Sequence, residues 1–157
     1  KAIEQSKEIA GLIATDPTVK YLSGKVTIYS TSPEMSRKAM VYYLDMSFGD
    51  HEGLITSKNP ETCTPEQIAF FKELFTGADY KENYAILNNY VKSLGDSIPP
   101  FIHLYIGLSP TMKTFGTTFD PDFGDCYDTA MIITTDDIYP DKYKRYVESY
   151  EKCKVRK

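Results

Sequence analysis

Apolar residues recur every three or four positions along several stretches of the chain, which is the spacing of one face of a helix. This spacing predicts helices at residues 2–14, 32–46, 64–75, 80–94, 100–107 and 143–150. The second of these has a start signal, with Ser32 as N-cap and Pro33 as the first helical residue. Thr64 and Gln67 form a capping box at the next helix start, and Gly95 closes the helix that follows.

Strands are predicted where apolar and polar positions alternate, at residues 20–30, 111–119 and 129–135. The segment "DPDFGDCYD" joins the last two and is rich in turn-forming residues, so an antiparallel hairpin is expected. The order of elements predicts an α/β fold with a small mixed sheet and a helical insertion at residues 47–98. All 157 residues are expected to form a single domain.

Charge and composition narrow the classes of function. The net charge of −4 and the lack of a basic stripe argue against nucleic acid as a partner. Cys63, Cys126 and Cys153 are widely spaced, and His51 and His103 are far apart in the sequence, so no metal site is expected. Scattered free thiols favour a cytoplasmic protein.

Two longer stretches carry a resemblance to a known enzyme family. They are "VKYLSGKVTIYSTSPEMSRKAMVYYL" and "IPPFIHLYIGLSPTMKTFGTTFDPDFGDCYDTAMIITTDDI". Together they resemble the C-terminal half of the ornithine-lipid and glycine-lipid N-acyltransferases, proteins often labelled hemolysins in Bacteroides-like bacteria. This family is similar to the acetyltransferase (GNAT) fold, and the block at residues 98–138 is the most specific part of the match.

The resemblance implies an activity and its partners. The parent protein would transfer a fatty acyl chain from acyl carrier protein to the amine of glycine or ornithine, in the synthesis of membrane aminolipids. The donor would be the acyl-phosphopantetheine of the carrier protein, with no bound cofactor. The protein would be cytoplasmic, with the inner membrane surface as a further partner.

The chain departs from the family pattern at its start. Family members are longer and begin with strands and a loop that cradles phosphopantetheine at a helix N-terminus. Because the chain begins with Lys1 inside the helix expected after that loop, it is expected to be the substrate-side part of a longer enzyme. These residues alone are therefore expected to be inactive.

The resemblance also implies roles for residues of the helix at 32–46. Acetyltransferases of this fold often place a tyrosine acid on this helix, which makes Tyr42 and Tyr43 candidates for catalysis. The alternative is that their rings pack in the core. Arg37, beside Ser36, is a candidate to hold the carboxylate of the amino acid in a bidentate fork, or else it is a solvated surface arginine.

The candidate residues at 98–138 also have structural roles as alternatives to functional ones. Asp125 is expected first to serve the turn that it shares with Pro121 and Gly124; the alternative is that it receives the ammonium group or relays its proton. Tyr105, Lys113 and Phe115 belong to segments that, on the resemblance, border the acyl-chain and acceptor side of the cleft; the alternative is that they close the core.

His103 lies among apolar residues and is expected to be a hydrogen-bonded core histidine rather than a base.

Two other classes of function compete with the enzyme. A non-catalytic module that binds an acyl chain, a carrier protein or a membrane surface fits the 13 tyrosines equally well. A membrane-lysing hemolysin fits less well, because the chain is acidic and has neither a span nor a basic amphipathic helix.

Overall fold

The computed structural model describes residue 16 and residues 18–145. They fall into two compact units: the first unit takes in residues up to 24, 100–112 and from 132, and the second unit takes in residues 25–99 and 113–131. The helix predicted at residues 2–14 lies outside the described residues, as does most of the helix predicted at 143–150.

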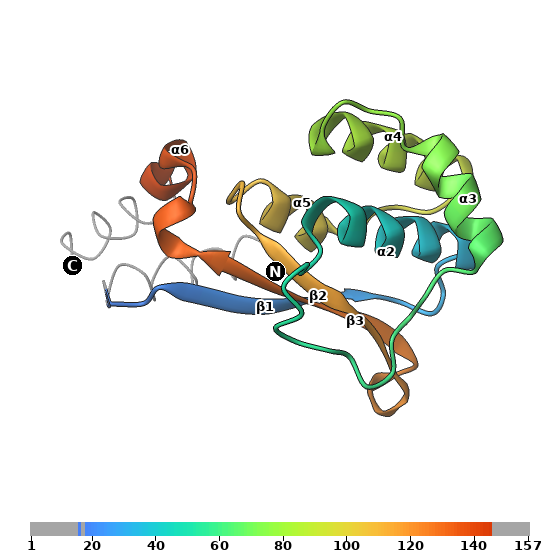
Figure 1. Cartoon of the computed structure of the whole chain (residues 1–157), viewed down its shortest axis with the longest axis horizontal. Helices are drawn as coiled ribbons and strands as arrows, with labels where there is room; N and C mark the ends of the chain where they lie inside the picture. The colour runs from blue at the N-terminus through green and yellow to red at the C-terminus, as the bar shows by residue number, and fades with distance from the viewer. Residues whose placement is uncertain (1–15, 17, 146–157) are drawn as a thin grey trace. The chain divides into compact units, whose positions relative to one another are not determined.

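The three predicted strands form one sheet. They are β1 (Tyr21–Ile28), β2 (Lys113–Asp120) and β3 (Cys126–Thr134), in the order β1-β3-β2. The strands run antiparallel (Figure 1), and a single parallel bridge joins Gly49 to Thr114 beside them. The α/β class and the hairpin of β2 and β3 are confirmed.

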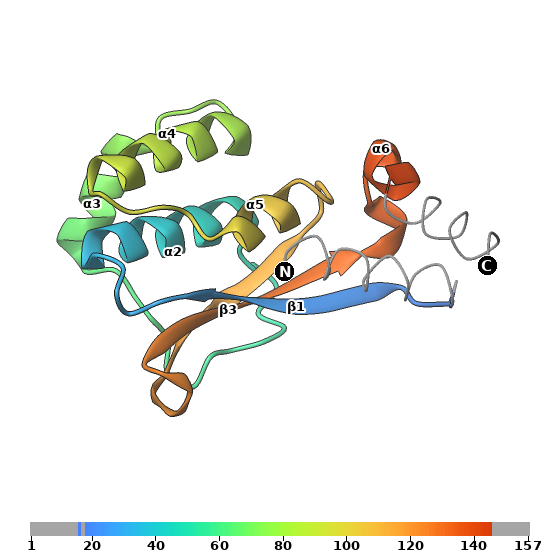
Figure 2. The same cartoon turned by 180° about the vertical axis from the view of Figure 1, so that it is seen from behind.

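The second unit holds three helices, α2 (Glu34–Phe48), α3 (Pro65–Leu74) and α4 (Tyr80–Ser93). Helix α2 packs on β2 and also contacts α3 and α4. Figure 2 shows α2, α3 and α4 on the same side of β2. Large apolar side chains are fully buried among these elements, including Tyr43, Phe71, Met40, Leu87 and Val91. Each such side chain contributes on the order of 1.5–3 kcal/mol by leaving water.

The predicted N-cap of α2 is wrong by one residue. The N-cap is Pro33, which caps the helix with no side-chain hydrogen bond, and its carbonyl accepts from the backbone N–H of Arg37 at 3.0 Å. The backbone N–H of Ser32 instead donates to the carbonyl of Tyr29 at 3.1 Å. A tight turn thus occupies the residues before Pro33, so the Ser32 hydroxyl does not cap the helix.

The other two predicted helix signals are confirmed. Thr64 accepts from the backbone N–H of Gln67 at 3.3 Å, and the Gln67 side chain accepts from the backbone N–H of Thr64 at 2.9 Å. Gly95 follows α4 with φ of +76°, a left-handed conformation that ends the helix and that glycine adopts without strain. Asp79 caps the start of α4 by accepting from two backbone N–H groups.

The connection from α2 to α3 follows β2. The backbone N–H of Asp50 donates to the carbonyl of Thr114 at 3.0 Å, and that of Glu61 donates to the carbonyl of Thr117 at 2.8 Å. An antiparallel bridge also joins Pro60 to Thr118, next to the second of these points. This attachment fixes the backbone of Glu61 close to α2, which itself packs on β2.

The first unit contains α5 (Pro100–Ile106) and α6 (Pro140–Tyr143). Tyr105 on α5 lies against Gly24 on β1, so closely that a Cβ atom at Gly24 would come within 2.2 Å of the tyrosine hydroxyl oxygen. A larger residue at position 24 would therefore displace the Tyr105 ring. The predicted core position of His103 is wrong, because this side chain is exposed on α5 while Ile102 and Ile106 are buried.

The described helices are either too short or too polar to cross a membrane.

Candidate functional site

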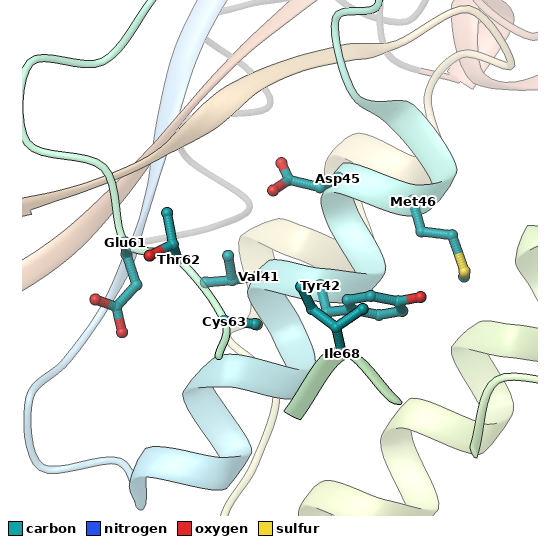
Figure 3. Close-up of a pocket in the computed structure, with 8 residues that line it drawn as sticks. All are labelled: Val41, Tyr42, Asp45, Met46, Glu61, Thr62, Cys63 and Ile68. Atoms are coloured by element: carbon teal, nitrogen blue, oxygen red, sulfur yellow. The ribbon is translucent and has the colours of Figure 1, made fainter. Parts of the chain in front are cut away.

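A pocket of about 460 Å³ lies in the second unit, between α2 and the segment that leads into α3 (Figure 3). Helix α2 supplies four of its lining residues, and the remainder come from residues 61–68. The lining consists of Val41, Tyr42, Asp45, Met46, Glu61, Thr62, Cys63 and Ile68. Most of these side chains present aliphatic, aromatic or sulfur-containing surface, so the wall is largely apolar with a few polar groups, as is typical of small-molecule sites.

Tyr42 forms part of this pocket with its ring held by other aromatic side chains. Its ring centroid lies 5.4 Å from that of Phe71 and 5.9 Å from that of Phe75, with the second pair almost parallel. Partial burial raises the pKa of the Tyr42 hydroxyl, and the thiol of Cys63 adds to the shift. The hydroxyl is therefore protonated at neutral pH and can donate a hydrogen bond.

Tyr43, the neighbouring candidate, lies in the core instead of the pocket. Its side chain is fully buried, and its hydroxyl donates to the backbone carbonyl of Tyr80 at 2.8 Å. Burial raises the pKa of this hydroxyl well above its ordinary value. The ring packs edge-on against Phe48 with centroids 6.1 Å apart. These contacts explain the position of Tyr43 as a packed residue of the core.

Arg37 is already engaged by a carboxylate of the protein. Its Nε lies 3.2 Å from Oε1 of Glu61, and its guanidinium lies over the ring of Tyr127, 4.1 Å from the centroid. The Arg37 side chain is only 12% exposed, so it is not a solvated surface arginine. Lys38 Nζ is 2.8 Å from the same Glu61 oxygen and also donates to the carbonyl of Thr62. Two cations thus neutralise Glu61.

Ser36, the residue predicted to act beside Arg37, is fully buried. Its hydroxyl donates to Oδ2 of Asp96 at 2.6 Å, which ties the start of α2 to the segment after α4. A hydrogen bond to a carboxylate is stronger than one between neutral groups. Ser36 therefore links two elements of the second unit.

Asp45 is the carboxylate of the pocket that has no protein partner among the described residues. Figure 3 shows it projecting from α2 toward the side on which Glu61 and Thr62 lie. Its side chain is solvent-exposed overall, but the apolar surroundings of the carboxylate raise its pKa above the ordinary value. The pocket lining contains no lysine, arginine or histidine that could neutralise it.

Cys63 lines the pocket as a thiol. Its Sγ lies 3.8 Å from the backbone carbonyl of Lys38, to which the thiol donates. Burial raises its pKa, against a smaller lowering effect of Lys38. A raised pKa keeps the sulfur protonated and weakly nucleophilic, so this cysteine lines the pocket without acting as a nucleophile.

The other candidates lie outside this lining. Lys113 and Phe115 are on β2, where Lys113 Nζ forms an ion pair with Glu52 at 2.9 Å and Phe115 is half-buried. Asp125 is exposed in the hairpin turn with φ of +52°, a left-handed conformation that aspartate tolerates better than most residues. Tyr105 belongs to the first unit, where burial raises the pKa of its hydroxyl.

The sequence predicted one lining residue of the pocket, Tyr42, and missed Asp45 and Glu61. A signal for Asp45 exists, because it lies three residues after Tyr42 and so falls on the same side of the helix. Glu61 has no such signal, since it is 24 residues from Arg37 and its position depends on the pairing with β2.

Comparison with known proteins relates the chain to one group of enzymes. It is 39% identical over 145 residues to a glycine N(alpha)-acyltransferase of Phocaeicola vulgatus, a match that covers 92% of this chain and 44% of that protein. It is 37% identical over 145 residues to the glycine N(alpha)-acyltransferase of Bacteroides thetaiotaomicron, with 90% of this chain and 42% of that protein covered.

The chain thus spans less than half the length of the curated relatives that it matches. No family model matches it. No solved structure matches it either. Since the similarity to these two proteins extends over nine-tenths of the chain, the resemblance to a part of an N-acyltransferase is confirmed.

Proposed function

We propose that the whole protein transfers an acyl group to the amine of an amino acid, with glycine as the first candidate acceptor. The observation that carries this proposal is the similarity, at 37–39% identity, to two proteins named glycine N(alpha)-acyltransferase. Because the chain spans less than half of these relatives, the proposal concerns the protein as a whole.

The proposed donor is a fatty acyl thioester of the phosphopantetheine arm of acyl carrier protein. The product, an acylated amino acid, would enter the synthesis of membrane aminolipids, and the enzyme would work in the cytoplasm at the surface of the inner membrane. The sequence resemblance to the ornithine-lipid and glycine-lipid N-acyltransferases supports these finer points.

The reaction sets physical requirements for any site that performs it. The amine nitrogen forms a bond to the carbonyl carbon of the thioester, the carbon–sulfur bond breaks, the nitrogen loses a proton and the thiolate gains one. The amine must be deprotonated for attack, and donors must face the developing oxyanion. In the pocket, Asp45 is a carboxylate that can face an amine, and Tyr42 keeps its proton at neutral pH.

The test is an assay of the full-length protein with a long-chain acyl carrier protein and glycine. We expect mass spectrometry to detect N-acylglycine, and ornithine in place of glycine tests the second acceptor. A catalytically silent protein that still binds the acylated carrier protein would favour the competing function, a binding module. Absence of both product and binding would contradict the proposal.

A further inference from the structure

We infer that the pocket on α2 binds the ammonium group of a primary aliphatic amine through the Asp45 carboxylate. The pocket's role as an acceptor site rests on the proposed function, but the binding of an amine does not.

Charge distinguishes the two carboxylates that line the pocket. Of the two carboxylates that line the pocket, Glu61 is held by Arg37 and Lys38, at 3.2 Å and 2.8 Å. Asp45 has neither an ion pair nor a hydrogen bond to its side chain from any residue that the structure describes, and the lining has no cationic side chain. The exposed Asp45 carboxylate is therefore free to pair with a ligand cation.

The second step is the position of Asp45 on its helix. Asp45 lies in the last turn of α2, which ends at Phe48. A negative charge near a helix C-terminus faces the negative end of the helix dipole, and aspartate is a poor residue for a helix interior. The carboxylate thus opposes the stability of α2 and has no described internal partner to offset that cost. Binding of a cation accounts for its presence.

The third step is the wall beside the carboxylate. Val41 lies on the same side of α2 as the Asp45 carboxylate, and Tyr42, Met46 and Ile68 continue the apolar lining away from it (Figure 3). A volume of about 460 Å³ exceeds what an ammonium ion alone would fill. An anionic ligand group would meet no cation in the lining, and a purely apolar ligand would leave Asp45 without a partner. The chemistry that satisfies both features is an ammonium group on a short hydrocarbon chain.

The experiment is a titration of the protein with n-butylammonium chloride at constant ionic strength, followed by calorimetry or by NMR. We expect saturable binding, with no binding of sodium butyrate and weaker binding of n-butanol. In Asp45→Asn the affinity should fall about tenfold, because the ammonium group then donates to a neutral amide oxygen instead of a charged carboxylate. Asp45→Glu should recover part of the affinity.

The matched control is Asp122→Asn, which removes the same charge from the exposed hairpin turn and should leave binding unchanged. Thermal unfolding of Asp45→Asn checks that the variant is folded. Equal affinity of wild type and Asp45→Asn, equal binding of butanol and butylammonium, or no saturable binding at all would overturn the inference.

The two proposals fail differently. If butylammonium binds through Asp45 but the full-length protein forms no N-acyl amino acid, the proposed function is wrong and the amine site stands. If acyl transfer occurs but Asp45→Asn changes neither amine binding nor the KM for the acceptor, the assignment of the site is wrong and the function stands.

Discussion

The first and last turns of α2 treat their polar side chains in opposite ways. In the first turns, Ser36 is bound to Asp96, and Arg37 and Lys38 both hold Glu61. In the last turn, Asp45 has no partner among the described residues. Both regions carry charged side chains, so the presence of charge alone does not mark a site. The difference indicates that the first region stabilises the fold, whereas Asp45 is available to a ligand.

The largest expected effect comes from breaking the paired region. Glu61→Gln removes the anion between Arg37 and Lys38, whose side chains are 12% and 11% exposed. Removal of one partner of a largely buried pair leaves charge uncompensated, so the free energy of unfolding should fall by about 3 kcal/mol. Urea unfolding measures this change.

The control for that variant is Glu73→Gln on the exposed surface of α3, which should change the free energy of unfolding by less than about 0.5 kcal/mol. If the two variants lost the same stability, the view of the Glu61 group as a structural element would be wrong.

The two adjacent tyrosines give the next comparison. Tyr43→Phe loses the hydrogen bond to the carbonyl of Tyr80 and should cost about 1 kcal/mol of unfolding free energy. Tyr42→Phe should cost less than about 0.5 kcal/mol, because the ring keeps its contacts with Phe71 and Phe75. Chemical denaturation of both variants decides the matter, and a reversed order would contradict their placement in core and pocket.

These contrasts show what the sequence could and could not predict. The strands, the capping box at Thr64 and the stop at Gly95 depend on local patterns, and all three are confirmed. The local pattern does not show that Tyr42 lies in the pocket and Tyr43 in the core. Adjacent residues on a helix differ by about 100° in direction, and both tyrosines fit an apolar face. The N-cap of α2 was missed because the turn from Tyr29 to Ser32 ends just before Pro33.

The pocket was harder to predict for a different reason. Its second wall comes from residues 61–68, which are placed by backbone pairing with β2 rather than by their own sequence pattern. The contacts of Arg37 could not be predicted from the sequence either, since Glu61 and Tyr127 approach it from distant parts of the chain. Non-local pairing therefore limits the prediction of sites more than the prediction of elements.

The smallest expected effect is that of Asp45→Asn on stability. The folded-state pKa of Asp45 is raised, so ionisation of this carboxylate costs the folded protein free energy. The contribution of this group to wild-type stability falls as the pH rises from its ordinary pKa, near 3.8, through the raised value. Asp45→Asn has no such pH-dependent loss. Its free energy of unfolding at neutral pH should therefore equal that of the wild type or exceed it by less than about 0.5 kcal/mol.

Thermal unfolding of both proteins between pH 3 and 8 measures the difference. The expected change in Tm is about 1–2 °C. A loss of more than about 1 kcal/mol in Asp45→Asn at neutral pH would mean that Asp45 has a stabilising partner in the protein, and the contrast between the two ends of α2 would not hold.

The most direct test of an available carboxylate is the pKa of Asp45 itself, measured by carbon-detected NMR with and without n-butylammonium. The other titratable groups of the pocket, Glu61, Cys63 and Tyr42, are followed in the same spectra. The account predicts a pKa above the ordinary value in the free protein and a lower pKa when the amine is bound, because a nearby cation favours the charged form. A pKa at or below the ordinary value that the amine does not change would contradict it.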